Sequence, residues 1–231
     1  GFENGNSQML MHISEQVANA VRLVIKSNLI GVYLTVSAVL GDWHYRKSDI
    51  DFTVVTNNSI SRETVTLLEK QMKPLETKHP KVKLEIQYIP VSILGKCKEE
   101  VEPILAYHDK KHIYHILILI RLPGIPKYGV AIWGAPIEKL NLKTTKDELF
   151  SYFYENVNTY WAAWGSSAAK IFSKKGFLSF TDCAVEWCVC DLSRMYYTLQ
   201  EKDITSKSGA LEYMMYKSPQ EYREILKEAQ A

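Results

Sequence analysis

The stretch LTVSAVLGDWHYRKSDIDFTVV, from Leu34 to Val55, contains two apolar runs separated by a small-residue turn and a basic, aromatic loop. The second run begins at two carboxylates, Asp49 and Asp51, with Ile50 between them. If the chain is extended there, both carboxylates point to one face and Ile50 points into the core. Two carboxylates this close repel each other unless a cation lies between them, and hard oxygen ligands suit Mg²⁺.

A third carboxylate is available further along the chain. Glu85 lies between Leu84 and Ile86 in an alternating run that predicts a strand over residues 82–89. If that strand neighbours the one that begins at Asp51, Glu85 joins the pair. Three carboxylates around Mg²⁺ at a sheet edge suit phosphoryl or nucleotidyl transfer. An Asp-x-Asp at a strand start is also a common turn cap, so the dipeptide alone leaves a structural role open.

Periodicity elsewhere predicts a sheet domain followed by helices. The first ninety residues predict a helix over 7–28, strands over 29–35, 51–56 and 82–89, and a helix from 58 to about 72. Residues 112–122 fit a strand or a buried helix, and Gly and Pro in 122–136 favour turns and short extended pieces. From Thr144 the pattern is helical, with helices expected over 145–172, 179–201 and 206–216 and a further start at Ser218. We therefore expect an α+β domain with a small mixed sheet over residues 1–140 and an all-α helical bundle over 141–231.

Composition narrows the class of protein. The 231 residues are 46% hydrophobic and 23% charged, which is ordinary for a globular protein, and a net charge of +2 is too weak to indicate nucleic-acid binding. The longest apolar run, around Ile116–Ile120, is too short to span a membrane. None of the four cysteines forms a C-x-x-C pair, and GFENGNSQ does not resemble an export signal. These features predict a cytoplasmic protein with reduced thiols, and they leave the oligomeric state open.

Two separate blocks of the chain resemble known families. A strand ending at Leu34, then Ser37, Gly41-Asp42-Trp43 and Ser48-Asp49-Ile50-Asp51 before an apolar strand, resembles the motif of the DNA polymerase β-like nucleotidyltransferases. The stretch DLSRMYYTLQEKDITSKSGALEYMM, Asp191–Met215, and the later SPQEYREILKEA resemble the helical domain of the aminoglycoside O-adenylyltransferases of the streptomycin/spectinomycin type. The resemblance covers nearly the whole chain.

This resemblance implies a reaction and a set of residues. It implies ATP and Mg²⁺ as cosubstrates and transfer of AMP to a hydroxyl of a small cationic antibiotic. It assigns the β- and γ-phosphates to Ser37, the metals to Asp49, Asp51 and Glu85, and a nucleotide phosphate contact to Lys207. Arg194 matches a family position for which a phosphate contact and a structural ion pair are both open.

The general base and the acceptor site are less sharply indicated. In the family the base, usually Glu, follows the third carboxylate along the chain. Here that window reads LAYHDKKH, so Asp109 is the nearest carboxylate, and His108 or His112 could serve as readily. A cationic acceptor calls for carboxylates and aromatic rings, which makes Asp182, Glu186 and Trp187 candidates, although a mixed helix face would contain the same residues.

Val36 departs from the family pattern. Family members nearly always have Gly before the Ser, because the backbone passes close to a phosphate there. A β-branched residue resists positive φ, so either the turn keeps a negative φ or nucleotide binding is impaired. The three carboxylates favour an active enzyme. The alternatives are a nucleotide-binding module without turnover and transfer of AMP to a protein hydroxyl, against which the appended helical domain argues.

Overall fold

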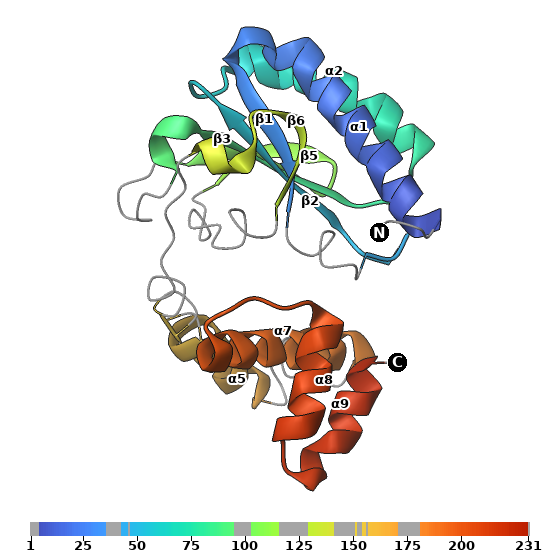
Figure 1. Cartoon of the computed structure of the whole chain (residues 1–231), viewed down its shortest axis with the longest axis vertical. Helices are drawn as coiled ribbons and strands as arrows, with labels where there is room; N and C mark the ends of the chain where they lie inside the picture. The colour runs from blue at the N-terminus through green and yellow to red at the C-terminus, as the bar shows by residue number, and fades with distance from the viewer. Residues whose placement is uncertain are drawn as a thin grey trace. The chain divides into compact units, whose positions relative to one another are not determined.

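The chain forms two compact units, Gly1–Thr144 and Thr145–Ala231 (Figure 1). This computed structural model describes residues 5–35, 43–45, 47–94, 103–115, 129–140, 151, 154–155, 157–170 and 181–230.

The first unit is built on a six-stranded mixed sheet in the order β5-β4-β3-β2-β1-β6. The strands are β1 (Leu29–Leu34), β2 (Ile50–Thr56), β3 (Leu84–Pro90), β4 (Ile104–His108), β5 (Lys111–His115) and β6 (Val130–Gly134). Only the β2–β3 pair is parallel, and the other four pairs are antiparallel. The predicted small mixed sheet is therefore confirmed.

Two helices, α1 (Gly5–Ile25) and α2 (Arg62–Lys78), lie side by side over one face of this sheet (Figure 1). Each places an apolar stripe in the core at helical spacing, made by Leu10, Ile13, Val17 and Val21 on α1 and by Leu68, Met72 and Leu75 on α2. Helix α2 also connects β2 to β3, since two parallel strands need a crossover between them.

Helix α2 begins and ends later than the sequence predicts. Its N-cap is Ser61, whose hydroxyl accepts a hydrogen bond from the Thr64 amide at 3.3 Å, rather than Asn58 or Ser59. The predicted end near Met72 is wrong, because the helix continues through Pro74 to Lys78. Leu75, beyond the proline, is buried in the core, so its packing offsets the hydrogen bond that the proline removes.

The sequence did not predict β4, whereas β5 overlaps residues 112–122, for which a strand was one of two alternatives. β4 and β5 form a hairpin through Asp109 and Lys110, which both have positive φ (47° and 61°), as a two-residue hairpin turn requires. β6 is one of the short extended pieces expected within residues 122–136, and it pairs antiparallel with β1. Gly134 has a φ of 98°, and a Cβ there would lie 2.3 Å from the Ile30 carbonyl oxygen, so only glycine allows this approach.

The second unit is helical throughout its described residues, as predicted. It contains α5 (Ala162–Ala168), α7 (Asp182–Glu201), α8 (Lys207–Lys217) and α9 (Arg223–Gln230). Thr181 and Ser206 cap α7 and α8 through their side chains, and Cys190, Leu211, Leu226 and Ala229 pack together between the last three helices. The fourth helix predicted to start at Ser218 is present but begins slightly later: Ser218 is the C-cap of α8, and a 3₁₀ turn over Gln220–Tyr222 leads directly into α9.

Short helical turns link these elements. They are Lys26–Asn28, Val91–Ile93, Ile137–Leu140 and Gln220–Tyr222 as 3₁₀ turns, and Val157–Trp161 as a π-helical turn before α5. Across the part of the chain that the structure describes, no helix combines the length and the apolar character needed to cross a membrane.

His112, in β5, is a buried titratable group that bears on the stability of the sheet. Its ring packs between Tyr88 and Tyr107, with ring centroids 5.7 Å and 4.9 Å away, and its Nε2 lies 3.2 Å from the Tyr88 hydroxyl. Its Nδ1 is buried without a hydrogen-bond partner, 3.8 Å from a Glu69 carboxylate oxygen. Burial lowers the pKa of His112 to about 4.

We predict that His112 makes the protein sensitive to mild acid. The unfolded chain binds this proton with a pKa near ~6.5, so the contribution is complete above that pH and is lost as the pH falls toward 4. The loss between pH 7.5 and 4.5 should be about 2 to 3 kcal/mol. His112→Phe keeps a ring and removes the proton, so urea unfolding at both pH values should show a smaller decrease for this variant.

The Tyr88 hydroxyl loses its hydrogen-bond partner in His112→Phe. This loss lowers the free energy of unfolding equally at both pH values, so it does not affect the difference between them. His12→Phe, at an exposed position of α1, is the matched control and should behave like the wild type. An equal decrease in His112→Phe and the wild type would contradict the prediction.

Candidate active site

The three predicted metal carboxylates lie on two neighbouring strands. Asp49 immediately precedes β2, Asp51 is within it, and Glu85 is the residue of β3 that pairs with Asp51 in the parallel register. Ile50 is fully buried, and its amide donates to the Lys83 carbonyl at 2.9 Å, which holds the two strands together at this point. The expected adjacency of β2 and β3 is therefore present, and the register brings Asp51 and Glu85 opposite each other.

The end of β1 is tied to the same place. Thr35 is buried, and both its amide and its hydroxyl donate to the Asp51 carbonyl oxygen, at 2.9 Å and 3.0 Å. The residues that the sequence assigns to the phosphate turn, Val36, Ser37 and Gly41-Asp42, lie outside the described residues. The chain thus enters this segment directly beside Asp51.

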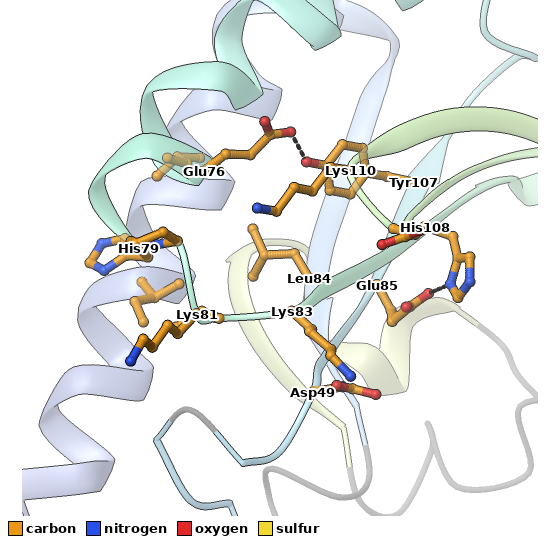
Figure 2. Close-up of a pocket in the computed structure, with 15 residues that line it drawn as sticks. Asp49, Glu76, His79, Lys81, Lys83, Leu84, Glu85, Tyr107, His108 and Lys110 are labelled. Atoms are coloured by element: carbon orange, nitrogen blue, oxygen red, sulfur yellow. Dashed lines mark hydrogen bonds and ion pairs between the residues drawn. The ribbon is translucent and has the colours of Figure 1, made fainter.

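Glu85 is hydrogen-bonded to His108, the last residue of β4. His108 Nδ1 lies 2.6 Å from Glu85 Oε2, and Figure 2 shows the two side chains pointing toward one another. Burial raises the pKa of Glu85, the His108 hydrogen bond opposes this, and the charges of Asp51 and Asp49 raise it further. The hydrogen bond to Glu85 in turn raises the pKa of His108.

A pocket of about 490 Å³ opens beside these residues (Figure 2). Its charged lining has both signs: the carboxylates of Asp49, Glu76, Glu85 and Asp109, and the amines of Lys81, Lys83 and Lys110. The Tyr107 hydroxyl donates a hydrogen bond to Glu76. Asp109, the predicted base, is exposed in the β4–β5 turn and lines the same pocket as Asp49 and Glu85. His112 has a buried side chain and is not part of the lining.

The chemistry of the donor set fits a divalent metal at two of the three carboxylates. Asp49 and Asp51 supply hard oxygens from one strand, and their negative charges act on Glu85 as well. Within the described ranges, no three His, Cys, Asp or Glu side chains are arranged to hold a metal ion together, and the Glu85 carboxylate is bonded to His108 instead. Asp49 and Asp51 are therefore the residues best suited to bind Mg²⁺.

The second unit brings two predicted phosphate contacts together. Arg194 on α7 lies 3.7 Å from the Asp191 carboxylate, and Lys207 is the first residue of α8. Burial raises the pKa of Asp191, and the nearby charges of Arg194 and Lys207 act against this. The sequence analysis missed Asp191, although its position three residues before Arg194 on a predicted helix was the available signal.

The predicted acceptor residues lie at the beginning of α7. Trp187 is 36% exposed, and its ring packs against Trp161 and Trp164 at centroid distances of 4.9 Å and 5.8 Å. Glu186 is exposed beside it. Asp182 is the first residue of the helix, and its side chain lies outside the described set.

The chain thus combines a mixed sheet that has carboxylates on its parallel pair with a separate helical unit. A family model of the aminoglycoside adenylyltransferase C-terminal domain matches residues 182–231. The structure resembles the crystal structure of spectinomycin adenyltransferase AAD(9) from Enterococcus faecialis with ATP and spectinomycin, with a TM-score of 0.68 and 18% identity over 95% of this chain and 88% of that chain. These findings confirm the predicted resemblance and fold.

Two further comparisons reveal no close relative of the chain. A mutant of the MntA–HpeT toxin–antitoxin gives a TM-score of only 0.30 at 13% identity, over 68% of this chain and 94% of that chain. Comparison with curated proteins finds no match.

We predict that the Thr35 hydroxyl stabilises the entry to the predicted phosphate turn. Thr35→Val keeps the shape and the amide hydrogen bond to Asp51 but removes the buried hydroxyl, so it should cost about 1 kcal/mol of unfolding free energy. Thr35→Ser retains the donor and is the control for it. Urea unfolding measures both, and a Thr35→Val variant as stable as the wild type would show that the hydroxyl contributes nothing.

Proposed function

We propose that this protein transfers AMP from ATP, in a Mg²⁺-dependent reaction, to a hydroxyl of a small cationic acceptor of the aminoglycoside type. The observation that carries this proposal is the pairing of Asp51 with Glu85 next to a pocket that Asp49 and Glu85 line. The match of residues 182–231 to the aminoglycoside adenylyltransferase C-terminal domain supports the choice of acceptor. The ATP and spectinomycin bound in AAD(9), which has the same fold, are consistent with both substrates.

The resemblance assigns nucleotide contacts to residues in each unit. Asp49 and Asp51 would bind Mg²⁺, which neutralises phosphate charge and polarises the α-phosphorus when it is present. Ser37 would donate to the β- and γ-phosphates, and Lys207 and Arg194 would add positive charge to the phosphates. The Arg194–Asp191 ion pair fits this role, because a guanidinium already oriented by a carboxylate loses less side-chain freedom on binding.

In the transfer step the acceptor oxygen forms a bond to the α-phosphorus and the bond to the bridging oxygen of the β-phosphate breaks. Pyrophosphate leaves, and the acceptor hydroxyl gives up its proton. Glu85 is the group best suited to take it, since its raised pKa makes it a stronger proton acceptor than an ordinary carboxylate and it lines the pocket. Asp109 lines the pocket as well and is the second candidate.

The acceptor would be recognised by its positive charge. Trp187, exposed on a cluster of three tryptophans, offers a ring face to an ammonium group, and Glu186 and Asp182 offer negative charge. We further propose that the protein acts in the cytoplasm, where the thiols of Cys188 and Cys190 stay free, and on a small molecule rather than on a nucleic acid.

The proposed reaction predicts release of pyrophosphate from ATP and Mg²⁺ in the presence of an acceptor from a panel that includes spectinomycin and streptomycin. EDTA should abolish the release. Asp51→Asn should lower kcat/KM about 1000-fold, because one metal ligand loses its charge. Glu15→Gln, at an exposed position of α1, is the control and should leave kcat/KM unchanged.

Failure of release across the whole panel would overturn the acceptor assignment. Binding of ATP and Mg²⁺ in calorimetry without release would instead support a nucleotide-binding relative that lacks turnover, which is the alternative that Val36 favours. Full activity in a folded Asp51→Asn variant would contradict the metal role.

The two candidate bases can be separated by isosteric amides. Glu85→Gln should lower kcat about 100-fold while the affinity for ATP stays close to that of the wild type, since only proton transfer is lost. Asp109→Asn should leave kcat close to that of the wild type. Steady-state kinetics measures both variants, and the opposite result would assign the base to Asp109.

A further inference from the structure

We propose that His108 is a positioning residue for the Glu85 carboxylate. By donating from Nδ1 to Oε2, it occupies one oxygen of the carboxylate and leaves Oε1 to receive the proton of the acceptor hydroxyl. This inference rests on the proposed function and deepens it. Nothing in the resemblance to the adenylyltransferases assigns this role to His108.

The strand ladder fixes the geometry of the pair. β3 and β4 are antiparallel, with Ile86 opposite Tyr107, so Glu85 and His108 follow as the next residues at the end of this ladder. His108 pairs with Lys111 across the β4–β5 hairpin, one residue beyond the last β3–β4 pair. Glu85 pairs with Asp51 of β2, so each partner of the 2.6 Å contact belongs to a strand that is hydrogen-bonded to a neighbour.

The exposure of the pair argues against a purely structural role. The side chain of His108 is 59% exposed and that of Glu85 is 29% exposed, so neither belongs to the hydrophobic core. Exposed ion pairs contribute little to stability because water competes for both partners. The histidines of the same unit that do serve the fold are buried, as His112 is by its two tyrosines.

The charges around Glu85 explain why a donor is needed there. Asp49 and Asp51 both act on Glu85, and Asp49 and Asp109 act on His108, so acidic groups face the pair from β2 and from the β4–β5 turn. Negative charges repel one another, so the neighbouring carboxylates do not hold Glu85 in place. A hydrogen-bond donor at Oε2 restrains the carboxylate of this pocket-lining residue, in the way that a carboxylate orients the histidine of a catalytic triad.

Kinetics can test the role with three variants. His108→Phe keeps the ring shape without a donor, His108→Asn places an amide nitrogen near the position of Nδ1, and Glu85→Gln removes the proton acceptor. We expect His108→Phe to lower kcat by about 10- to 100-fold with little change in KM for ATP, as is usual for residues that orient a reacting group. His108→Asn should recover most of this loss.

The double variant His108→Phe with Glu85→Gln separates positioning from other roles. If His108 acts through Glu85, the double variant should be no slower than Glu85→Gln alone. Multiplicative losses, or a His108→Phe variant with wild-type kcat, would overturn the inference. A change confined to the Mg²⁺ dependence would also overturn it, since it would indicate that Glu85 is a metal ligand.

A second readout does not require turnover. ¹⁵N NMR of the six histidine rings, assigned for His108 with His108→Phe, reports which ring nitrogen carries a proton at neutral pH. We expect a protonated Nδ1 on His108 whose shift changes in Glu85→Gln but not in Glu76→Gln, the matched control for a carboxylate of the same pocket that is bonded to Tyr107. If no acceptor supports turnover, the proposed function fails. Independently of turnover, a His108 ¹⁵N shift that is the same in Glu85→Gln and in the wild type would overturn the proposed interaction between His108 and Glu85.

Discussion

The parallel pairing of β2 with β3 is the constraint on which the site depends. Its register places Asp51 opposite Glu85 and uses the buried Ile50 as the anchor between Asp49 and Asp51. Because side chains alternate across a strand, a slip of one residue would turn Glu85 to the other face and bury polar groups under the helices. Burial of the hydrophobic residues on both sides of the carboxylates therefore fixes the strand register, and with it the relative positions of the three carboxylates.

The same arrangement explains how three carboxylates are tolerated so close together. They lie where β2 and β3 begin, and Asp49 and Glu85 line a pocket there. Burial and the charges of Asp51 and Asp49 raise the pKa of Glu85, and His108 supplies a hydrogen-bond donor to its carboxylate. In the second unit the charges are reversed: the Asp191 carboxylate forms an ion pair with Arg194 and lies close enough to Lys207 for the two charges to interact.

The parts of the fold that local pattern could predict were α1, β1, β2, β3 and the C-terminal helices, whose apolar spacing or capping residues are visible in the chain. Local pattern failed at Pro74, where burial of Leu75 lets α2 continue past a helix breaker, and it indicated β6 only as one of several turns and short extended pieces, because the pairing with β1 is not visible in the chain. For the site, the spacing of Asp49 and Asp51 indicated a carboxylate pair but left a turn-capping role open, and Glu85 joined the pair only on the expectation that β3 is a neighbour. The bond from His108 to Glu85 could not be found this way, because β4 was not predicted.

What the sequence determined by itself is therefore local: which segments are helical or extended, and which short motif carries the paired carboxylates. Those properties follow from the preferences of residues close together in the chain, and the resemblance to the adenylyltransferases rests on the same short motifs. The tertiary structure alone decided that Asp51 pairs with Glu85, that Thr35 bonds to Asp51, and that His108 reaches Glu85. Each of these contacts joins residues distant in sequence, and the register of hydrogen-bonded strands brings them together only when the whole sheet has formed.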